Sequence, residues 1–203
     1  IQVLEKNNYG GKVVTFGSYF EIGDCDLNEF LTESEVVHSD FPTRNLYSLS
    51  KRLLSRFWSS YSGPIKWCHL ILPSIYGKGE NPGRLIPYLI DAAQTKNKIQ
   101  VTQGGQVRQY LHVSDVVSFI ALFYKNPITV GIYNLSPDTS LTIADLRASV
   151  MEIVANENKF EIEIIPKRDE NMKILQLAST KARACGWLPS MSLENGIRSY
   201  LKV

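Results

Sequence analysis

The chain has 203 residues, of which 44% are hydrophobic and 21% are charged, and its net charge is +2. This composition is typical of a soluble globular protein with one large domain or two small ones. The mixed charges argue against a nucleic-acid-binding surface, and no apolar run is long enough to span a membrane. The three cysteines are scattered and form no C-x-x-C pair, which argues against a disulfide framework or a thiolate metal site and favours a reducing compartment.

The first part of the chain predicts the start of a parallel α/β sheet. Residues 1–6 resemble the end of a helix and lack the features of a signal peptide, so we expect the sequence to begin partway along a longer chain. A short β-rich run follows at 13–16, and the polar segment 24–40 is expected to be a loop with a helical turn. Leucine and aromatic side chains at helical spacing predict a helix at 45–61. The apolar run 66–72 hardly alternates, as is typical of strands buried on both faces, so the order predicts a βαβ unit.

Beyond a loop at 78–83 the predicted elements become shorter. Ser114 is expected to be the N-cap of the apolar helix that it begins. The segment 160–165 alternates glutamate with apolar residues, which is typical of a half-exposed edge strand. The same patterns predict helices at 84–96, 114–124, from Ser140 or Thr142 to about 156, at 180–185 and at 193–202, and strands at 99–102, 109–113, 130–135 and 160–165.

Tyr47 and Lys51 are the first candidates for chemistry. They lie four residues apart in the predicted helix 45–61 and therefore share one helix face. An ammonium group beside a phenol stabilises the phenolate, which brings a phenol toward the range useful for acid–base catalysis. Ser18 adds a hydroxyl at the end of the preceding strand, so the three residues suit hydride transfer at a carbonyl group. The Y-x-x-x-K spacing alone is a weak signal, because it also occurs on helices that bear a half-buried tyrosine and a solvated lysine.

Several segments, taken in order, carry a resemblance to a known family. They are Val14–Ser18, Tyr47–Lys51, Pro73–Gly77, Arg84–Pro87, Gly105–Asp115, Tyr133–Leu135 and Gly186–Pro189. Over nearly its whole length the chain thereby resembles the extended short-chain dehydrogenase/reductase family, the NAD(P)-dependent nucleotide-sugar epimerases, dehydratases and reductases. The family's N-terminal G-x-x-G-x-x-G turn has no counterpart in the sequence, so the chain is similar to the C-terminal part of such an enzyme.

The resemblance implies an α/β fold with a Rossmann-like doubly wound parallel sheet, of which only the second half is present, and a smaller α+β substrate-binding lobe. The first domain would comprise residues 1–77, and the lobe residues 78–203, with segments around 109–135 returning to the Rossmann domain. The resemblance also implies NAD or NADP as cofactor, a nucleotide-sugar substrate, a homodimer and a cytoplasmic protein that binds neither nucleic acid nor membrane.

The resemblance also assigns roles to individual residues. Tyr47 would be the general acid/base. Lys51 would stabilise the Tyr47 phenolate and hold the nicotinamide ribose. Ser18 would donate a hydrogen bond to the same substrate oxygen, with Thr15 as the alternative hydroxyl. Pro73 is expected beside the nicotinamide. No metal site is expected.

The expected substrate-binding residues differ in how strongly the sequence supports each of them. Arg108 aligns with an arginine that binds the substrate diphosphate, a task that suits the paired donors of a guanidinium. Ser74 replaces a common asparagine, and Gln109 replaces the usual aspartate, which puts the support of Arg108 in question. His112 and Asp115 are interpreted as structural. The full set of expected substrate-binding residues is Ser74, Arg84, Ile99, Val101, Arg108, Arg168 and Asn171.

Tyr19 and Phe20 narrow the expected reaction. In the 4,6-dehydratase branch two acidic residues follow the catalytic threonine, whereas here both positions are aromatic and Glu21 is offset by one residue. The resemblance therefore implies a 4-ketoreductase of deoxysugar or polysaccharide biosynthesis, with a 4-epimerase as the alternative. From another class, the chain could be a non-catalytic fragment or a sugar-nucleotide binding module that lacks the cofactor half. A family member recruited for RNA or protein binding is a further alternative, although the even charge distribution argues against RNA.

Overall fold

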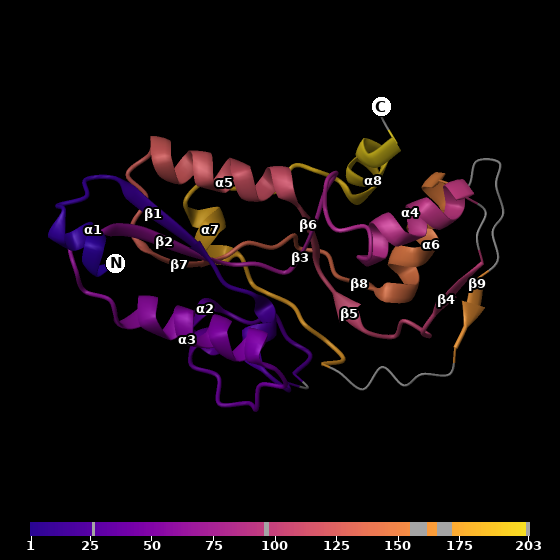
Figure 1. Ribbon diagram of the computed structural model, residues 1–203, viewed down its shortest axis with the longest axis horizontal. Helices are drawn as coiled ribbons and strands as arrows, with labels where there is room; N and C mark the ends of the chain where they lie inside the picture. Colours follow the sequence, from indigo (N-terminus) through magenta and orange to yellow (C-terminus); the bar gives the residue numbers. More distant parts are fainter. Residues whose placement is uncertain (26, 96–97, 155–161, 166–171, 202–203) are drawn as a thin grey trace.

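A three-stranded parallel sheet forms one end of the molecule (Figure 1). The computed structural model describes residues 1–25, 27–95, 98–154, 162–165 and 172–201. In the sheet, β2 (Lys66–Ile71) lies between β1 (Lys12–Phe16) and β7 (Gly131–Asn134), and both pairings are parallel. β1 lies at one edge of this sheet. The predicted α/β fold with parallel strands is confirmed.

Helices cover both faces of this sheet. α2 (Glu33–Val37) and α3 (Leu46–Ser60) lie on one face, and α5 (Val113–Lys125) and α7 (Thr180–Ala184) lie on the other (Figure 1). In β2, Trp67 packs in the cluster of Trp58 from α3, whereas Cys68 packs with Phe119 from α5. Successive side chains of a strand point to opposite faces, so a strand that is apolar at nearly every position suits a sheet covered on both sides.

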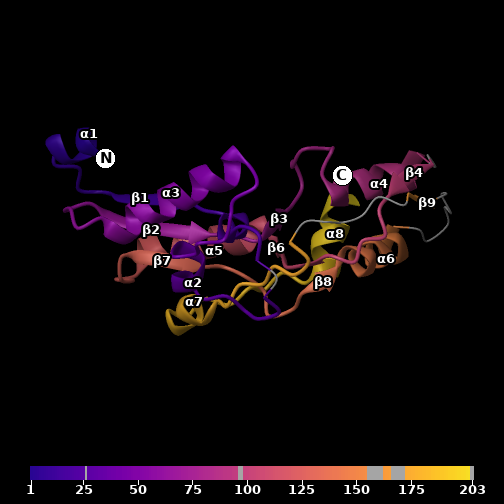
Figure 2. The ribbon, with the colours of Figure 1, turned by 90° about the horizontal axis from the view of Figure 1, so that it is seen from below.

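The other end of the molecule is mainly helical (Figures 1 and 2). It contains α4 (Leu85–Thr95), α6 (Ile143–Val154), α8 (Leu193–Leu201), and β4 (Ile99–Val101) paired in parallel with β9 (Ile162–Ile164). Leu89, Leu146 and Ile197 of the three helices meet in one apolar core. Two short pairs lie between the ends: β3 (Ser74–Tyr76) with β6 (Tyr110–His112), and β5 (Val107–Arg108) with β8 (Leu141–Thr142).

The structure corrects several local predictions. α5 begins at Val113, and its N-cap is His112, whose side chain accepts a hydrogen bond of 3.2 Å from the Ser114 amide. Ser114 is therefore inside the helix rather than its cap, while the structural interpretation of His112 is confirmed. The helical turn predicted within 24–40 is present as α2, which a capping box formed by Thr32 and Glu35 starts. The short strands β3, β5 and β8 were not predicted, because two or three residues carry too little periodicity.

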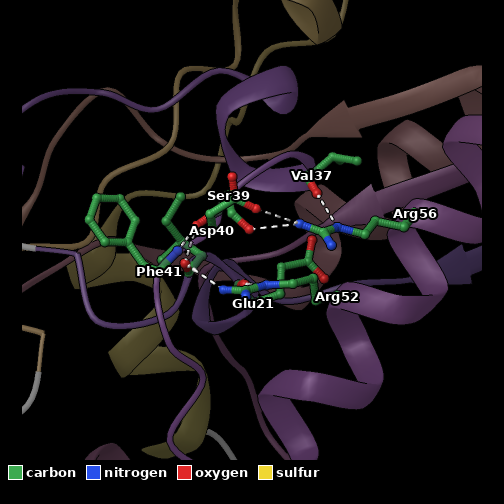
Figure 3. A network of polar contacts seen from close by, with 8 residues as sticks. Glu21, Val37, Ser39, Asp40, Phe41, Arg52 and Arg56 are labelled. Atoms are coloured by element: carbon green, nitrogen blue, oxygen red, sulfur yellow. Dashed lines mark hydrogen bonds and ion pairs between the residues drawn. The ribbon is translucent and has the colours of Figure 1, made fainter.

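The helix α3 is joined firmly to the segment that follows β1. There the chain forms the short helix η1 (Tyr19–Ile22), after a first helix α1 (Gln2–Lys6) at the start of the chain. Arg52 of α3 donates hydrogen bonds of 2.7 Å to the carbonyls of Glu21 and Ile22, the last two residues of η1 (Figure 3). Gly23 follows with φ of 87°, and a Cβ there would lie 2.6 Å from the Arg52 guanidinium. Ser18, the N-cap of η1, is consequently held at a fixed place relative to α3.

In the described part of the chain, no helix has both the length and the apolar character needed to cross a membrane.

Candidate active site

A cavity of about 480 Å³ opens at the carboxyl end of β1 and β2, beside α3. We call it the tyrosine cavity. Its polar lining comes from Ser18, Tyr47, Lys51, Ser74 and Arg84, and its apolar lining from Phe16, Phe20, Leu72, Pro73 and Ile75, together with Gly17. All three residues predicted to be catalytic, and Pro73, therefore face one space. Crevices at the carboxyl ends of parallel strands are where open α/β sheets bind their ligands.

Tyr47 and Lys51 lie on one face of α3, as their spacing predicts. The Lys51 ammonium lies 5.7 Å from the centre of the Tyr47 ring and donates a hydrogen bond of 2.8 Å to the Phe16 carbonyl at the end of β1. This bond fixes the ammonium at the sheet edge beside the tyrosine. Tyr47 is 53% exposed, so its phenol is open to a ligand in the cavity.

Ser18 is the hydroxyl that the structure places in this cavity. Its Oγ accepts a hydrogen bond of 3.4 Å from the Phe20 amide as the cap of η1, and the residue is 5% exposed. The alternative, Thr15, does not line the cavity. Its Oγ1 lies 2.8 Å from Nδ1 of His69, on the α3-facing side of the sheet.

Glu21 also lies outside the tyrosine cavity, in a buried polar network. Both of its carboxylate oxygens lie 2.9 Å from Ser55 Oγ, which is 2.7 Å from Nε2 of His69. Burial raises the pKa of Glu21 to about 7, although its hydrogen bond with Ser55 opposes the shift. Burial also lowers the pKa of His69 to about 4. Glu21 does not supply an acid to the cavity, which agrees with leaving it out of the predicted site.

A second cavity of about 330 Å³ adjoins the first. We call it the arginine cavity. It is lined by Tyr76, Glu80, Leu85, Ile86, Gln106, Arg108, Tyr110 and Ile143. Phe20, Ser74, Ile75 and Arg84 line both cavities, so the two are adjacent. The Arg108 guanidinium is held by the Val107 carbonyl at 2.7 Å and the Lys173 carbonyl at 3.4 Å.

The two departures from the family pattern have structural explanations. The short Ser74 side chain contacts Tyr19, whose hydroxyl lies 2.8 Å from Ser74 Oγ. Gln109 is fully buried and faces away from Arg108. Its amide donates to the Pro137 carbonyl at 2.7 Å and its oxygen accepts from the Leu177 amide at 2.6 Å, so it joins two chain segments.

Two of the predicted substrate-binding residues, Ile99 and Val101, are not among the residues that line these cavities. Ile99 is 3% exposed in the core cluster of α4, α6 and α8, and Val101 packs against the same cluster. Arg168 and Asn171 lie outside the described residues. Asp115 accepts hydrogen bonds from the Ser190 and Met191 amides, which confirms its structural interpretation.

Several lining residues were missed from the sequence. Phe20 was noted only as a non-acidic residue, yet its ring lies in both cavities. Glu80 was treated as part of a loop, although its carboxylate lies 3.0 Å from the Arg84 guanidinium. The four-residue spacing of Glu80 and Arg84 was the signal that could have revealed this pair. Gln106 and Tyr110 belong to the matching segment Gly105–Asp115 but were not singled out within it, and Ile143 lies in α6, where no local pattern marks it.

The parallel sheet covered on both faces, with Tyr47 and Lys51 at its carboxyl edge, defines a short-chain dehydrogenase/reductase type of protein. Residues 1–136 match the model of the NAD dependent epimerase/dehydratase family, and the chain belongs to that family.

Curated relatives and solved structures agree with this assignment. The chain is 24% identical over 181 residues to CDP-abequose synthase of Salmonella typhimurium, covering 84% of this chain and 60% of that protein. Its fold matches dTDP-glucose 4,6-dehydratase of Bacillus anthracis, solved in complex with NAD, with a TM-score of 0.80, 19% identity and coverage of 98% and 63%. UDP-glucose 4-epimerase of Thermus thermophilus, also solved with NAD, gives a TM-score of 0.80, 21% identity and coverage of 98% and 65%. The chain thus spans little more than half the length of the curated relatives it matches.

Proposed function

We propose that this chain is the catalytic and substrate-binding part of an NAD(P)-dependent 4-ketoreductase acting on a nucleotide-linked deoxyhexose. The observation that carries the proposal is that four residues line both cavities, because the cavity with Tyr47, Lys51 and Ser18 is then adjacent to the one with Arg108. A hydroxyl-rich reaction centre beside a guanidinium suits a sugar joined to a diphosphate. The similarity to CDP-abequose synthase supports the reductive direction.

In this proposal each residue has a defined task. NAD(P), when bound, supplies the hydride. The Tyr47 phenol donates its proton to the keto oxygen of the sugar, and the Lys51 ammonium stabilises the phenolate that remains. The Ser18 hydroxyl donates a hydrogen bond to the same oxygen, which stabilises charge that develops there. Lys51 and Tyr47 would also hold the nicotinamide ribose, with Pro73 beside the ring.

The aromatic residues after Ser18 support reduction over dehydration. Phe20 lines both cavities with an apolar ring, and Tyr19 is buried against Ser74. Burial raises the pKa of Tyr19, so this hydroxyl stays neutral over the physiological range. Neither residue offers the acid–base pair that elimination of water requires.

The proposed substrate contacts follow from the lining. Arg108 binds the diphosphate, and Arg84 and Ser74 contact the sugar-phosphate portion where the cavities meet. Ile99, Val101, Arg168 and Asn171 remain predicted contacts of the nucleotide.

The experiment is a screen of CDP-, UDP- and dTDP-linked 4-keto-deoxyhexoses with the full-length protein, following the absorbance of reduced cofactor. A ketoreductase consumes reduced cofactor in proportion to product. Interconversion of two sugars without net consumption would instead identify the 4-epimerase, and binding without either reaction would identify the binding module. Tyr47→Phe is expected to abolish turnover while retaining affinity for the nucleotide sugar. Equal turnover by the variant would remove Tyr47 from the mechanism.

The proposal includes a cytoplasmic homodimer, each subunit with a Rossmann part (1–77) and a substrate lobe (78–203) from which segments around 109–135 return to the Rossmann part. α3 carries an exposed apolar stripe of Leu46, Leu49, Leu53 and Phe57, which suits a subunit interface. The cysteines Cys25, Cys68 and Cys185 are scattered along the chain and form no C-x-x-C pair, which suits a reducing compartment. Leu53→Glu should convert the full-length protein from dimers to monomers in sedimentation analysis. The same mass for the wild type and the variant would contradict this interface.

A further inference from the structure

The C-terminal helix reaches the site through a chain of polar contacts. The loop from β3 to α4 passes beside α8 (Figures 1 and 2). The Tyr200 hydroxyl of α8 accepts a hydrogen bond of 2.6 Å from the Gly77 amide and donates one to the Glu80 carboxylate. The other Glu80 oxygen lies 3.0 Å from the Arg84 guanidinium. One hydroxyl therefore joins two points of this loop, Gly77 at its start and Glu80 in its middle, to α8.

The burial of these groups favours a fixed arrangement. The Glu80 side chain is only 13% exposed, whereas the Arg84 side chain is 52% exposed. The Tyr200 pKa is raised by burial, and the neighbouring Glu80 carboxylate adds to the shift, so the hydroxyl keeps its proton and remains a donor. A half-buried carboxylate with two partners holds its position, and Arg84 is left as the member of the chain that reaches solvent.

α8 can approach the loop closely because of a glycine. A Cβ at Gly196 would lie 2.6 Å from Cε2 of Tyr76, a residue that is 3% exposed in β3. A side chain at this position would push α8 away from β3 and so would move Tyr200, one turn further along the helix.

We propose that Glu80 and Tyr200 are positioning residues that hold the Arg84 guanidinium at the junction of the two cavities, so that α8 sets the affinity for the anionic part of the substrate. Arg84 lines both cavities, and a guanidinium there is placed to bind a phosphate or sugar oxygen. The ion pair with Glu80 orients this group before a ligand arrives, which reduces the ordering cost of binding. The inference about affinity rests on the proposed function, whereas the contact between α8 and the loop does not.

The test has two arms on the full-length protein. In the first, amide hydrogen exchange of the segment containing Gly77 is compared in wild type, Tyr200→Phe, Glu80→Gln and Gly196→Ala. We call the contacts of Tyr200 with Gly77 and Glu80 the clamp. Faster exchange in all three variants is expected, because each one removes or displaces a member of the clamp. Glu194→Gln is the matched control, since Glu194 and Arg198 form an ion pair with the same four-residue spacing on the exposed face of α8. Unchanged exchange in Tyr200→Phe would overturn the clamp.

The second arm measures the affinity for CDP, UDP and dTDP by titration calorimetry. Tyr200→Phe keeps all charges, so a weakening of about fivefold, equivalent to about 1 kcal/mol, reports the loss of positioning. In an Arg84→Met background the same change should have no further effect, because the clamp acts through Arg84. Equal weakening in both backgrounds would overturn the inference. If the wild type bound none of the three diphosphates, the proposed function would fail, while the exchange arm would still decide the clamp.

Discussion

The Tyr19 hydroxyl and Ser74 Oγ lie 2.8 Å apart and join the segment after β1 to the start of β3. Tyr19 is 1% exposed, whereas Ser74 lines both cavities. A buried aromatic residue thus orients a hydroxyl of the cavity wall. The pair bears on the proposed reaction, since the resemblance implies an acid at this position in the dehydratase branch, whereas here Tyr19 supports the shape of the wall.

Tyr19→Phe is expected to lower the free energy of unfolding by about 1 kcal/mol, the usual value of one intramolecular hydrogen bond. Ser74→Ala should have a similar effect, and the double variant should cost less than the sum of the two, because both single changes remove the same bond. Urea denaturation of the four proteins measures this. Strict additivity would show that the two hydroxyls do not depend on each other.

Lys51 offers a sharper test of the reaction centre. Lys51→Met keeps the aliphatic stem but removes the ammonium that donates to the Phe16 carbonyl at the sheet edge. Turnover should fall by about 100-fold or more, within the range for loss of a group that supports acid–base catalysis. Lys66→Met, at the opposite end of the sheet, is the control and should leave turnover unchanged. Comparable rates for Lys51→Met and wild type would exclude the ammonium from the reaction.

Gly23 tests how η1 is held against α3. Alanine there would place a Cβ 2.6 Å from the Arg52 guanidinium and 2.7 Å from the Pro42 carbonyl, at a φ of 87° that L-residues rarely adopt. Gly23→Ala should therefore destabilise the protein by about 2 kcal/mol or more. At Gly10 a Cβ would meet nothing within 4 Å, so Gly10→Ala is the matched control. Similar melting temperatures for the two variants would contradict the close packing at Gly23.

The parts of the site that depend on local spacing could be predicted from the sequence. Tyr47 and Lys51 share a helix face because they are four residues apart, and Ser18 follows a short strand. The apolar run of β2 likewise predicted a strand covered on both faces. These features are set by backbone geometry, which a sequence pattern reports directly.

Contacts between distant segments could not be predicted in this way. Tyr19 and Ser74 are 55 residues apart, and Tyr200 and Glu80 are 120 residues apart. Their pairing depends on how η1, β3 and α8 pack. Many tyrosines of the chain could form such a contact, and composition alone does not show which of them do. The role of Gln109 was missed for the same reason, since its partners lie in two later segments of the chain.

Glu21 and His69 give the stability of the protein a distinctive pH dependence. Burial raises the pKa of Glu21 to about 7 and lowers that of His69 to about 4, while both groups bind Ser55. As the pH rises from about 4.5 to about 7, the unfolded chain loses the Glu21 proton before the native state does, so this group makes the native state progressively less stable. From about pH 4 to about 6.5 the neutral native His69 has the opposite effect, so the two contributions largely offset each other.

Glu21→Gln separates the two effects, because it keeps an acceptor for Ser55 and removes the titration of the carboxyl. Relative to wild type, the variant should gain stability by about 3 kcal/mol between about pH 4.5 and 7, with no further change above that range. Urea unfolding at half-unit intervals of pH measures the difference. Glu194→Gln removes an exposed carboxyl and serves as the control for a general charge effect. A Glu21→Gln difference that stayed constant from pH 4.5 to 8 would show that the Glu21 carboxyl titrates alike in the folded and unfolded chains, and Glu21 would then have no part in the pH dependence.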